Sequence, residues 1–187
     1  MRMALDTRSW TVADLATMPD DGQRYEVIDG ELFVTPAPAL RHQDAILALA
    51  AILRPYVMQH AIGHLVVSPA DVKFSPSRGV QPDLFVARLV EGKRPRESSE
   101  IRGLLLAVEV LSPSTAIADR VVKRALYRDE GVDEYWVVDL EKRRFERSTP
   151  ADTAVALEVD TLRWQPAGAR SALVIDLKRY FAEVLDD

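Results

Sequence analysis

Two carboxylates stand at the boundaries of apolar runs in this chain. Asp83 directly precedes the run from Leu84 to Ala87, and Glu109 follows the run from Leu104 to Val108. An unpaired carboxylate at the end of a buried strand is costly, so it requires a proton, a cationic partner or a metal ion. If the two strands are neighbours, about 4.8 Å apart, both side chains can converge on one hard cation. Carboxylate oxygens suit Mg²⁺ or Mn²⁺, with water and phosphate oxygens completing the octahedron.

Lys123 is the third residue whose position could serve chemistry. It lies in a stretch with helical spacing, Ile117 to Glu130, at the edge of an apolar face and four residues from both Asp119 and Tyr127. From there its ammonium could orient or deprotonate a water molecule, or neutralise charge in a transition state. The competing interpretation is a solvent-exposed ion pair between Asp119 and Lys123 with little energetic importance, and spacing alone favours it slightly.

The elements around these residues follow from hydrophobic spacing. The continuous apolar run from Leu104 to Val108 is typical of a buried strand, and Ser112 to Thr115 forms a turn before the helix. The β-branched and aromatic run Glu134 to Leu140 then predicts a neighbouring strand. Pro82 and Asp83 alone are common turn chemistry before a strand, so this dipeptide carries no functional weight by itself.

Upstream, Asp29-Gly30 between Arg24 to Ile28 and Glu31 to Val34 predicts a β-hairpin that carries the carboxylates Glu26 and Glu31. The remaining segments are a short helix over 10–18, a helix from Leu40 with His42 in its first turn, strands over 65–67, 72–74, 145–146, 154–159 and 174–175, a turn-rich break over 75–79, an exposed loop over 88–103, and a closing helix over 177–185. A mixed sheet flanked by helices, of the α/β (α+β) class, is the economical architecture, and residues 1–187 are expected to form one domain.

Composition limits the classes of function. The chain has 187 residues, 48% of them hydrophobic and 28% charged, and no cysteine, so it can have no disulfide or thiolate metal site. The absence of cysteine fits a cytoplasmic setting. The N-terminal segment 1–15 lacks a long apolar core, which predicts neither a signal peptide nor a membrane span. The net charge of -5 and the pI of about 5.3 have the wrong sign for nucleic acid, so phosphate binding would need a local patch or bound cations.

A resemblance to a known family joins these features. The strings YEVIDGEL, QPD, VEVLSPST and GVDEYWVVD, with a helix that opens on His42 and the pattern D-x-x-x-K-x-x-x-Y, resemble the Uma2 family of restriction-endonuclease-like proteins. That family belongs to the PD-(D/E)xK nuclease superfamily. The resemblance covers roughly Arg24 to Leu140, and the run from Glu109 to Trp136 is its specific part. It implies a restriction-endonuclease-like αβββαβ core, here with an N-terminal hairpin and a β-rich C-terminal extension, and metal-dependent hydrolysis of phosphodiester bonds.

The resemblance also implies roles for individual residues. Asp83 would be a metal ligand from the PD element, and Glu109 would be the acid of the (D/E)xK element, with the Val110 carbonyl as a further ligand of Mg²⁺. The lysine of that element is replaced by Leu111, and Lys123 on the next helix is the candidate substitute. Secondary family positions are Glu31, His42 and Tyr127, of which Glu31 could add an acidic ligand or accept a proton, and Gln81 stands where the family usually has arginine.

Two functions from different classes compete. The first is a Mg²⁺-dependent (or Mn²⁺-dependent) endonuclease that acts on DNA as a homodimer, since cutting both strands in one encounter needs two sites. The second is a catalytically inactive nuclease-fold module for binding or assembly, which the acidic pI and Leu111 favour. A glycoside hydrolase with a carboxylate pair is disfavoured by the presence of only three tryptophans. The nuclease would draw its local positive surface from Arg41, Lys93, Arg94, Arg96, Arg120 and Arg124, and the apolar segment Leu173 to Leu185 could take part in a dimer interface.

Overall fold

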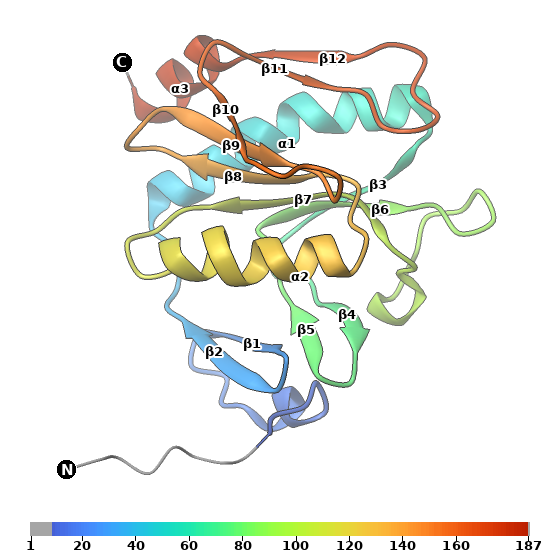
Figure 1. The fold of residues 1–187 in the computed structure, drawn as a ribbon, viewed down its shortest axis with the longest axis vertical. Coiled ribbons are helices and arrows are strands. Elements are labelled where there is room, and N and C mark those ends of the chain that lie inside the picture. Colours follow the sequence, from blue (N-terminus) through green and yellow to red (C-terminus); the bar gives the residue numbers. More distant parts are fainter. Residues whose placement is uncertain (1–8, 187) are drawn as a thin grey trace.

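The structure, a computed structural model, describes residues 9–186 and is built around a six-stranded β-sheet (Figure 1). The strand order is β10-β9-β8-β7-β6-β3, and neighbouring strands are antiparallel except for the parallel pair β7 and β8. Residues 1–8, part of the segment for which no signal peptide is predicted, lie outside the described residues. The six strands are β3 (Gly63–Val67), β6 (Leu84–Arg88), β7 (Leu104–Val110), β8 (Tyr135–Asp139), β9 (Arg144–Ser148) and β10 (Ala156–Glu158).

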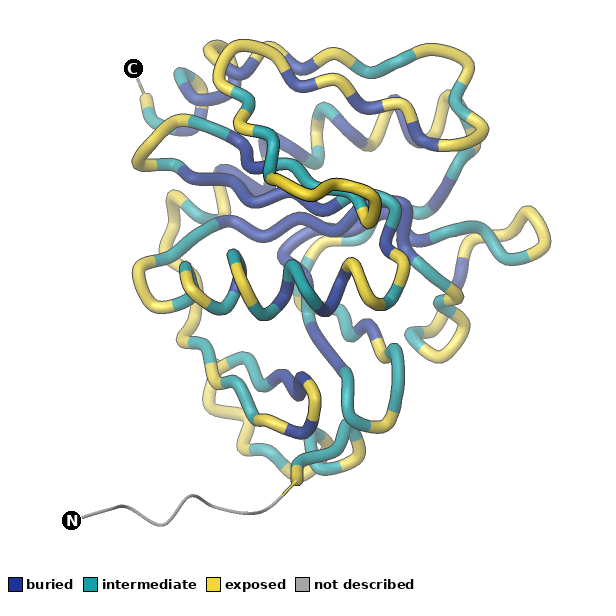
Figure 2. Tube along the Cα trace, in the orientation of Figure 1, coloured by how far each residue is buried: buried dark blue, intermediate teal, exposed yellow. Residues whose placement is uncertain are grey.

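Helices cover both faces of this sheet. The helices α1 (Leu40–His60) and α3 (Leu177–Leu185) share one hydrophobic core with alternate residues of the central strands, such as Leu106 and Val108. The helix α2 (Arg124–Asp129) packs on the opposite face, and every residue of β7 is buried between the two layers (Figure 2). The order α1-β3-β6-β7-α2-β8 confirms the predicted αβββαβ core and the mixed sheet flanked by helices.

A second, four-stranded sheet with the order β2-β1-β5-β4 lies beside the α2 face. The predicted hairpin is confirmed, because Asp29 and Gly30 both take positive φ angles, 53° and 84°, as a type I′ turn requires. The segment 75–79, predicted as a turn-rich break, contains a turn at residues 76–77 and also the start of a strand that was not predicted, in which Gly79 pairs with Val27. The four strands are β1 (Arg24–Ile28), β2 (Glu31–Thr35), β4 (Val72–Ser75) and β5 (Arg78–Val80).

The helical stretch after β7 begins differently from the prediction. Residues Ala118–Lys123 form a π-helix, η3, which continues into the α-helix Arg124–Asp129. A π-helical turn holds more residues than an α-helical one and is often found at functional sites. In α1 the helix continues through Pro55 to His60. Among residues 9–186, no helix is both long enough and apolar enough to cross a membrane.

The C-terminal segment packs into the hydrophobic core that α1 shares with the central sheet. The strands β11 (Thr161–Trp164) and β12 (Leu173–Asp176) form a separate hairpin, of which β11 was not predicted. On α3 the apolar side chains Leu177, Tyr180, Phe181 and Val184 are buried in the protein's own core. The expectation that this segment offers an apolar surface to a partner is therefore wrong for these four side chains, which an amphipathic helix directs inward. Two short 3₁₀ helices complete the fold, η1 (Asp14–Thr17) where a helix over 10–18 was predicted, and η2 (Ser98–Glu100) within the loop 88–103.

Candidate active site

Asp83 and Glu109 lie at the same edge of the central sheet because of the register between β6 and β7. Leu84 pairs with Val108 in the antiparallel ladder, so Asp83 and Glu109 follow as the next opposed residues. Leu84 and Val108 both belong to the core beneath α1. Since side chains alternate along a strand, the carboxylates of Asp83 and Glu109 both point to the opposite face, toward η3 and α2.

Asp83 is held by three donors from three different elements. Its Oδ1 accepts a hydrogen bond from Arg24 Nη2 at 2.8 Å, and its Oδ2 accepts from the backbone N–H of Val110 at 2.8 Å. Nε2 of His42 lies 3.0 Å from the same Oδ2. Burial acts to raise the pKa of Asp83, but the hydrogen bond from His42 and the charge of Arg24 outweigh it and lower the pKa to about 2. Asp83 is therefore a carboxylate at neutral pH.

Glu109 uses its two oxygens differently. Its Oε1 accepts hydrogen bonds from Lys123 Nζ and from the hydroxyl of Tyr127, both at 3.0 Å. Its Oε2 faces Arg24, whose Nη1 lies 3.9 Å away. Burial raises the pKa of Glu109 well above its usual value, and the nearby acids, Asp83 among them, add to the shift against the opposing charge of Lys123.

Lys123 is enclosed by carboxylates rather than exposed beside one. Its Nζ lies 2.9 Å from Glu26 Oε2, 3.0 Å from Glu109 Oε1 and 3.7 Å from Asp119 Oδ1, and the residue is only 4% exposed. Burial acts to lower the pKa of Lys123, but Glu109, Glu26 and Asp119 together raise it. The solvent-exposed ion pair considered from spacing alone is therefore wrong, because η3 turns both Asp119 and Lys123 inward.

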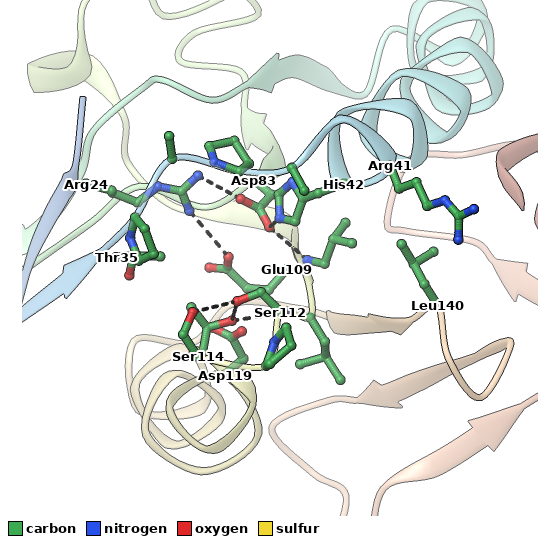
Figure 3. A pocket seen from close by; sticks show the side chains of 18 of the residues that line it. Arg24, Thr35, Arg41, His42, Asp83, Glu109, Ser112, Ser114, Asp119 and Leu140 are labelled. Atoms are coloured by element: carbon green, nitrogen blue, oxygen red, sulfur yellow. Dashed lines mark hydrogen bonds and ion pairs between the residues drawn. The ribbon is translucent and has the colours of Figure 1, made fainter.

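The acids of this cluster outnumber its permanent cations. The four buried carboxylates Glu26, Asp83, Glu109 and Asp119 face two permanent cations, Arg24 and Lys123, which leaves two negative charges to be met by protons or by a further cation. The cluster opens into a pocket of about 290 Å³. Figure 3 shows Asp83 and His42 on one side of this pocket and Ser112, Ser114 and Asp119 on the other.

The donor chemistry of the pocket fits Mg²⁺ or Mn²⁺. Among residues 9–186, no group of three or more His, Cys, Asp or Glu side chains is arranged to hold a metal ion unaided. Mg²⁺ does not need such a group, because it keeps several waters and takes one or two carboxylates together with substrate phosphates. Asp83 Oδ1 and Glu109 Oε2 are suited to that use, since both face the same pocket from neighbouring strands.

Of the six site residues expected from sequence, five come together. Asp83, Glu109, Lys123, His42 and Tyr127 are connected by the contacts described above. Glu31 does not join them, because it is the exposed first residue of β2 and is not part of the pocket lining.

Three members of the cluster were not expected as site residues, namely Arg24 and Glu26 on β1 and Asp119 on η3. Besides Lys123, Glu26 is held by the backbone N–H of Gln81, which donates to its Oε1 at 2.8 Å. The available signal was the spacing of two, which places Arg24 and Glu26 on the same face of the predicted strand.

The basic residues expected to form a positive surface are scattered. Arg120 and Arg124 are neutralised by ion pairs with buried Glu146, and Arg120 also contacts Asp139. Residues Lys93, Arg94 and Arg96 line a separate open hollow in the loop between β6 and β7, at the end of these strands opposite to Asp83 and Glu109 (Figure 1). Only Arg41 of the six lines the pocket itself.

Comparison with known proteins places this arrangement in a family. The model of the family Uma2, described as "Putative restriction endonuclease", matches residues 12–175. The chain belongs to the Uma2 family. The Uma2 fold is similar to a crystal structure from Anabaena variabilis, described as "a putative nuclease belonging to DUF820", with a TM-score of 0.77 and 17% identity over 93% of this chain and 98% of the other. At that identity the likeness shows a shared restriction-endonuclease-like fold. No curated protein matches the chain.

Proposed function

We propose that this Uma2 protein is an endonuclease that hydrolyses phosphodiester bonds of DNA with Mg²⁺ or Mn²⁺ held by Asp83 and Glu109. The observation that carries the proposal is the convergence of Asp83 Oδ1 and Glu109 Oε2 on one pocket, within a cluster whose carboxylates outnumber its permanent cations. The description of the family as restriction endonucleases supports the same class of reaction.

The surrounding residues fix the two carboxylates in place. Lys123 and Tyr127 bind Glu109 through Oε1, and Val110 and His42 bind Asp83 through Oδ2, so each acid keeps one oxygen directed toward the pocket. A bound Mg²⁺ or Mn²⁺ would supply Lewis acidity to a phosphoryl oxygen and favour ionisation of the attacking water. The raised pKa of Lys123, which its carboxylate partners maintain against burial, supports a cationic role for this residue rather than that of a base.

Duplex DNA is the substrate that we propose, cut by a homodimer because two sites are needed to cleave both strands in one encounter. The net charge of -5 requires phosphate contacts to be local. Arg41 lines the pocket and is exposed, so it is placed to meet the backbone of a strand that enters there. Ser112 and Ser114 supply hydroxyl groups on the opposite wall (Figure 3).

Nicking of supercoiled plasmid DNA tests the proposal. We expect cleavage with Mg²⁺ or Mn²⁺, none with EDTA, and a loss of about 10²-fold or more in Asp83→Asn and in Glu109→Gln. Glu31→Gln is the matched control, since it removes an exposed carboxylate outside the pocket and should leave cleavage unchanged. Plasmid that stays intact with the wild-type protein, or cleavage that survives both site substitutions, contradicts the proposal and favours the binding or assembly module.

A further inference from the structure

Arg24 occupies the space between the two carboxylates that are proposed to hold the metal ion. It is the first residue of β1, and its side chain, 14% exposed, extends from the second sheet toward the edge of the central sheet. Its Nη2 lies 2.8 Å from Asp83 Oδ1 and 3.3 Å from Ser68 Oγ, and its Nη1 lies 3.9 Å from Glu109 Oε2. Figure 3 shows the guanidinium facing both carboxylates.

Arg24 faces the one oxygen of each acid that no other residue among 9–186 contacts through a hydrogen bond or an ion pair. Asp83 Oδ2 is engaged by Val110 and His42, and Glu109 Oε1 is engaged by Lys123 and Tyr127. Only Asp83 Oδ1 and Glu109 Oε2 remain for a cation in the pocket, and both are directed to the guanidinium. A metal ion and the Arg24 side chain therefore compete for the same two atoms.

We propose that Arg24 is an exchangeable counter-ion. Its guanidinium pairs with Asp83 and Glu109 before metal binds, and then moves away from them to form an ion pair with a phosphate of the nucleic acid. The proposal rests on the proposed function, because it assumes that these two acids bind the metal. Arg24 lines the pocket, so its displaced side chain stays within reach of a bound strand. The planar fork of arginine suits phosphate as well as carboxylate, because it offers two parallel N–H donors to either group.

The exchange makes metal and DNA bind cooperatively. Each metal ion that binds must break the contact between Arg24 and Asp83, which weakens the intrinsic metal affinity. A phosphate that binds the released guanidinium recovers part of the free energy lost when the contact between Arg24 and Asp83 breaks. DNA therefore strengthens metal binding, and metal strengthens DNA binding by the same factor. A purely structural salt bridge would behave differently, because its removal would lower stability without raising the affinity for metal.

Calorimetric titration with Mn²⁺ alone separates these possibilities. We expect Arg24→Gln to bind Mn²⁺ about tenfold more tightly than the wild-type protein, within the usual range of coupling between sites. Arg41→Gln is the matched control, because it removes the same charge from the same pocket while its side chain points away from Asp83 and Glu109 (Figure 3), and it should change affinity by less than about twofold. Equal affinity in Arg24→Gln and the wild-type protein, or an equal gain in Arg41→Gln, overturns the proposal.

A second substitution at Arg24, a titration in the presence of DNA and a metal-site variant complete the test. If Arg24→Gln does not fold, Arg24→Lys keeps the charge but loses the fork, and a gain of about threefold in Mn²⁺ affinity supports the exchange while no gain overturns it. DNA with phosphorothioate linkages should raise the Mn²⁺ affinity of the wild-type protein by a larger factor than it raises the Mn²⁺ affinity of Arg24→Gln. If DNA raises both affinities by the same factor, Arg24 does not move to phosphate.

Asp83→Asn separates this inference from the proposed function. If Mn²⁺ binding is lost in Asp83→Asn but is unchanged in Arg24→Gln, only the exchange is refuted. If Mn²⁺ binding survives in Asp83→Asn, both the exchange and the proposed function are refuted.

Discussion

Lys123 donates a hydrogen bond to Oε1 of Glu109 at 3.0 Å, although the two residues lie 14 positions apart on different elements. In the (D/E)xK pattern that the sequence resembles, a lysine comes two residues after the acid, where this chain has the half-buried Leu111. The π-helix η3 brings Lys123 to the acid from the segment that follows β7. The amine and the acid therefore meet through tertiary structure, and the lysine is shared with Glu26 and Asp119.

Lys123→Met tests the importance of this shared amine. The substitution leaves Glu26, Glu109 and Asp119 buried without their common cation, and removing one partner of a buried ion pair costs about 3–5 kcal/mol. We expect a loss of about 3 kcal/mol in the free energy of unfolding, measured by urea denaturation, together with loss of DNA cleavage. Lys142→Met, at an exposed lysine, is the control and should change stability by less than about 0.5 kcal/mol. Equal stability of the two variants would show that Lys123 is not the counter-ion of the cluster.

Tyr127→Phe isolates a single neutral donor to Glu109. The ring stays packed between Phe74 and Tyr135, while the hydrogen bond to Glu109 Oε1 is removed. We expect a loss of about 1–2 kcal/mol in the free energy of unfolding, since Glu109 is buried and its Oε1 loses a hydrogen-bond donor that no water replaces. Cleavage should fall by less than about tenfold, because Lys123 still holds the same oxygen. A loss of cleavage as large as that of Asp83→Asn would assign Tyr127 a direct part in the reaction.

The two acids and the strands that carry them could be predicted from the sequence because their signals are local. Asp83 and Glu109 each flank a short apolar run bounded by turn residues, a pattern that predicts a buried strand, and both runs are strands. The hairpin was equally predictable, since Asp29-Gly30 determines its turn.

The rest of the cluster depends on packing that the local sequence does not encode. The hairpin carries two acids, Glu26 and Glu31, and only the docking of the second sheet decides that Glu26 is buried against Lys123. The π-helical turn is likewise not visible in the sequence, because its apolar spacing also fits an α-helix. The pattern therefore identified Lys123 as a candidate with Asp119 beside it, but it did not indicate that both are buried or that Glu26 joins them.

A pH-dependent contribution to stability is expected from Glu146, which lies away from the pocket. Its carboxylate accepts hydrogen bonds from Arg120, Arg144 and Arg124 at 2.9, 2.9 and 3.0 Å. Burial acts to raise the pKa of Glu146, but these arginines outweigh it and lower the pKa below the usual value of 4.5. A lowered folded-state pKa means that the stabilisation is complete above the unfolded-state pKa and is lost as the pH falls through the folded-state pKa.

Glu146→Gln should therefore reduce the melting temperature most at neutral pH. We expect the difference in melting temperature between the wild-type protein and the variant to narrow between about pH 5 and about pH 3, where the wild-type carboxylate becomes protonated. Melting followed by circular dichroism across that range measures the difference. If the difference in melting temperature between the wild-type protein and Glu146→Gln stays constant with pH, the charge of Glu146 does not contribute to stability.

The loop between β6 and β7 gives the last prediction, because its position decides whether a single subunit can use it. Lys93, Arg94 and Arg96 lie in the loop that follows β6, and the site lies at the other end of the same strands, about 20 Å away for a strand of this length. Because the loop and the pocket lie at opposite ends of these strands, we expect a duplex bound at the pocket to make its phosphate contacts there and not with the loop of the same subunit. We therefore expect the triple variant Lys93→Gln, Arg94→Gln, Arg96→Gln to change DNA affinity and its salt dependence much less than Arg41→Gln does, as measured by fluorescence anisotropy at several salt concentrations. If the triple variant instead reduces the salt dependence by about one phosphate contact per residue, DNA must contact the loop, and a homodimer that places one subunit's loop beside its partner's pocket would explain it.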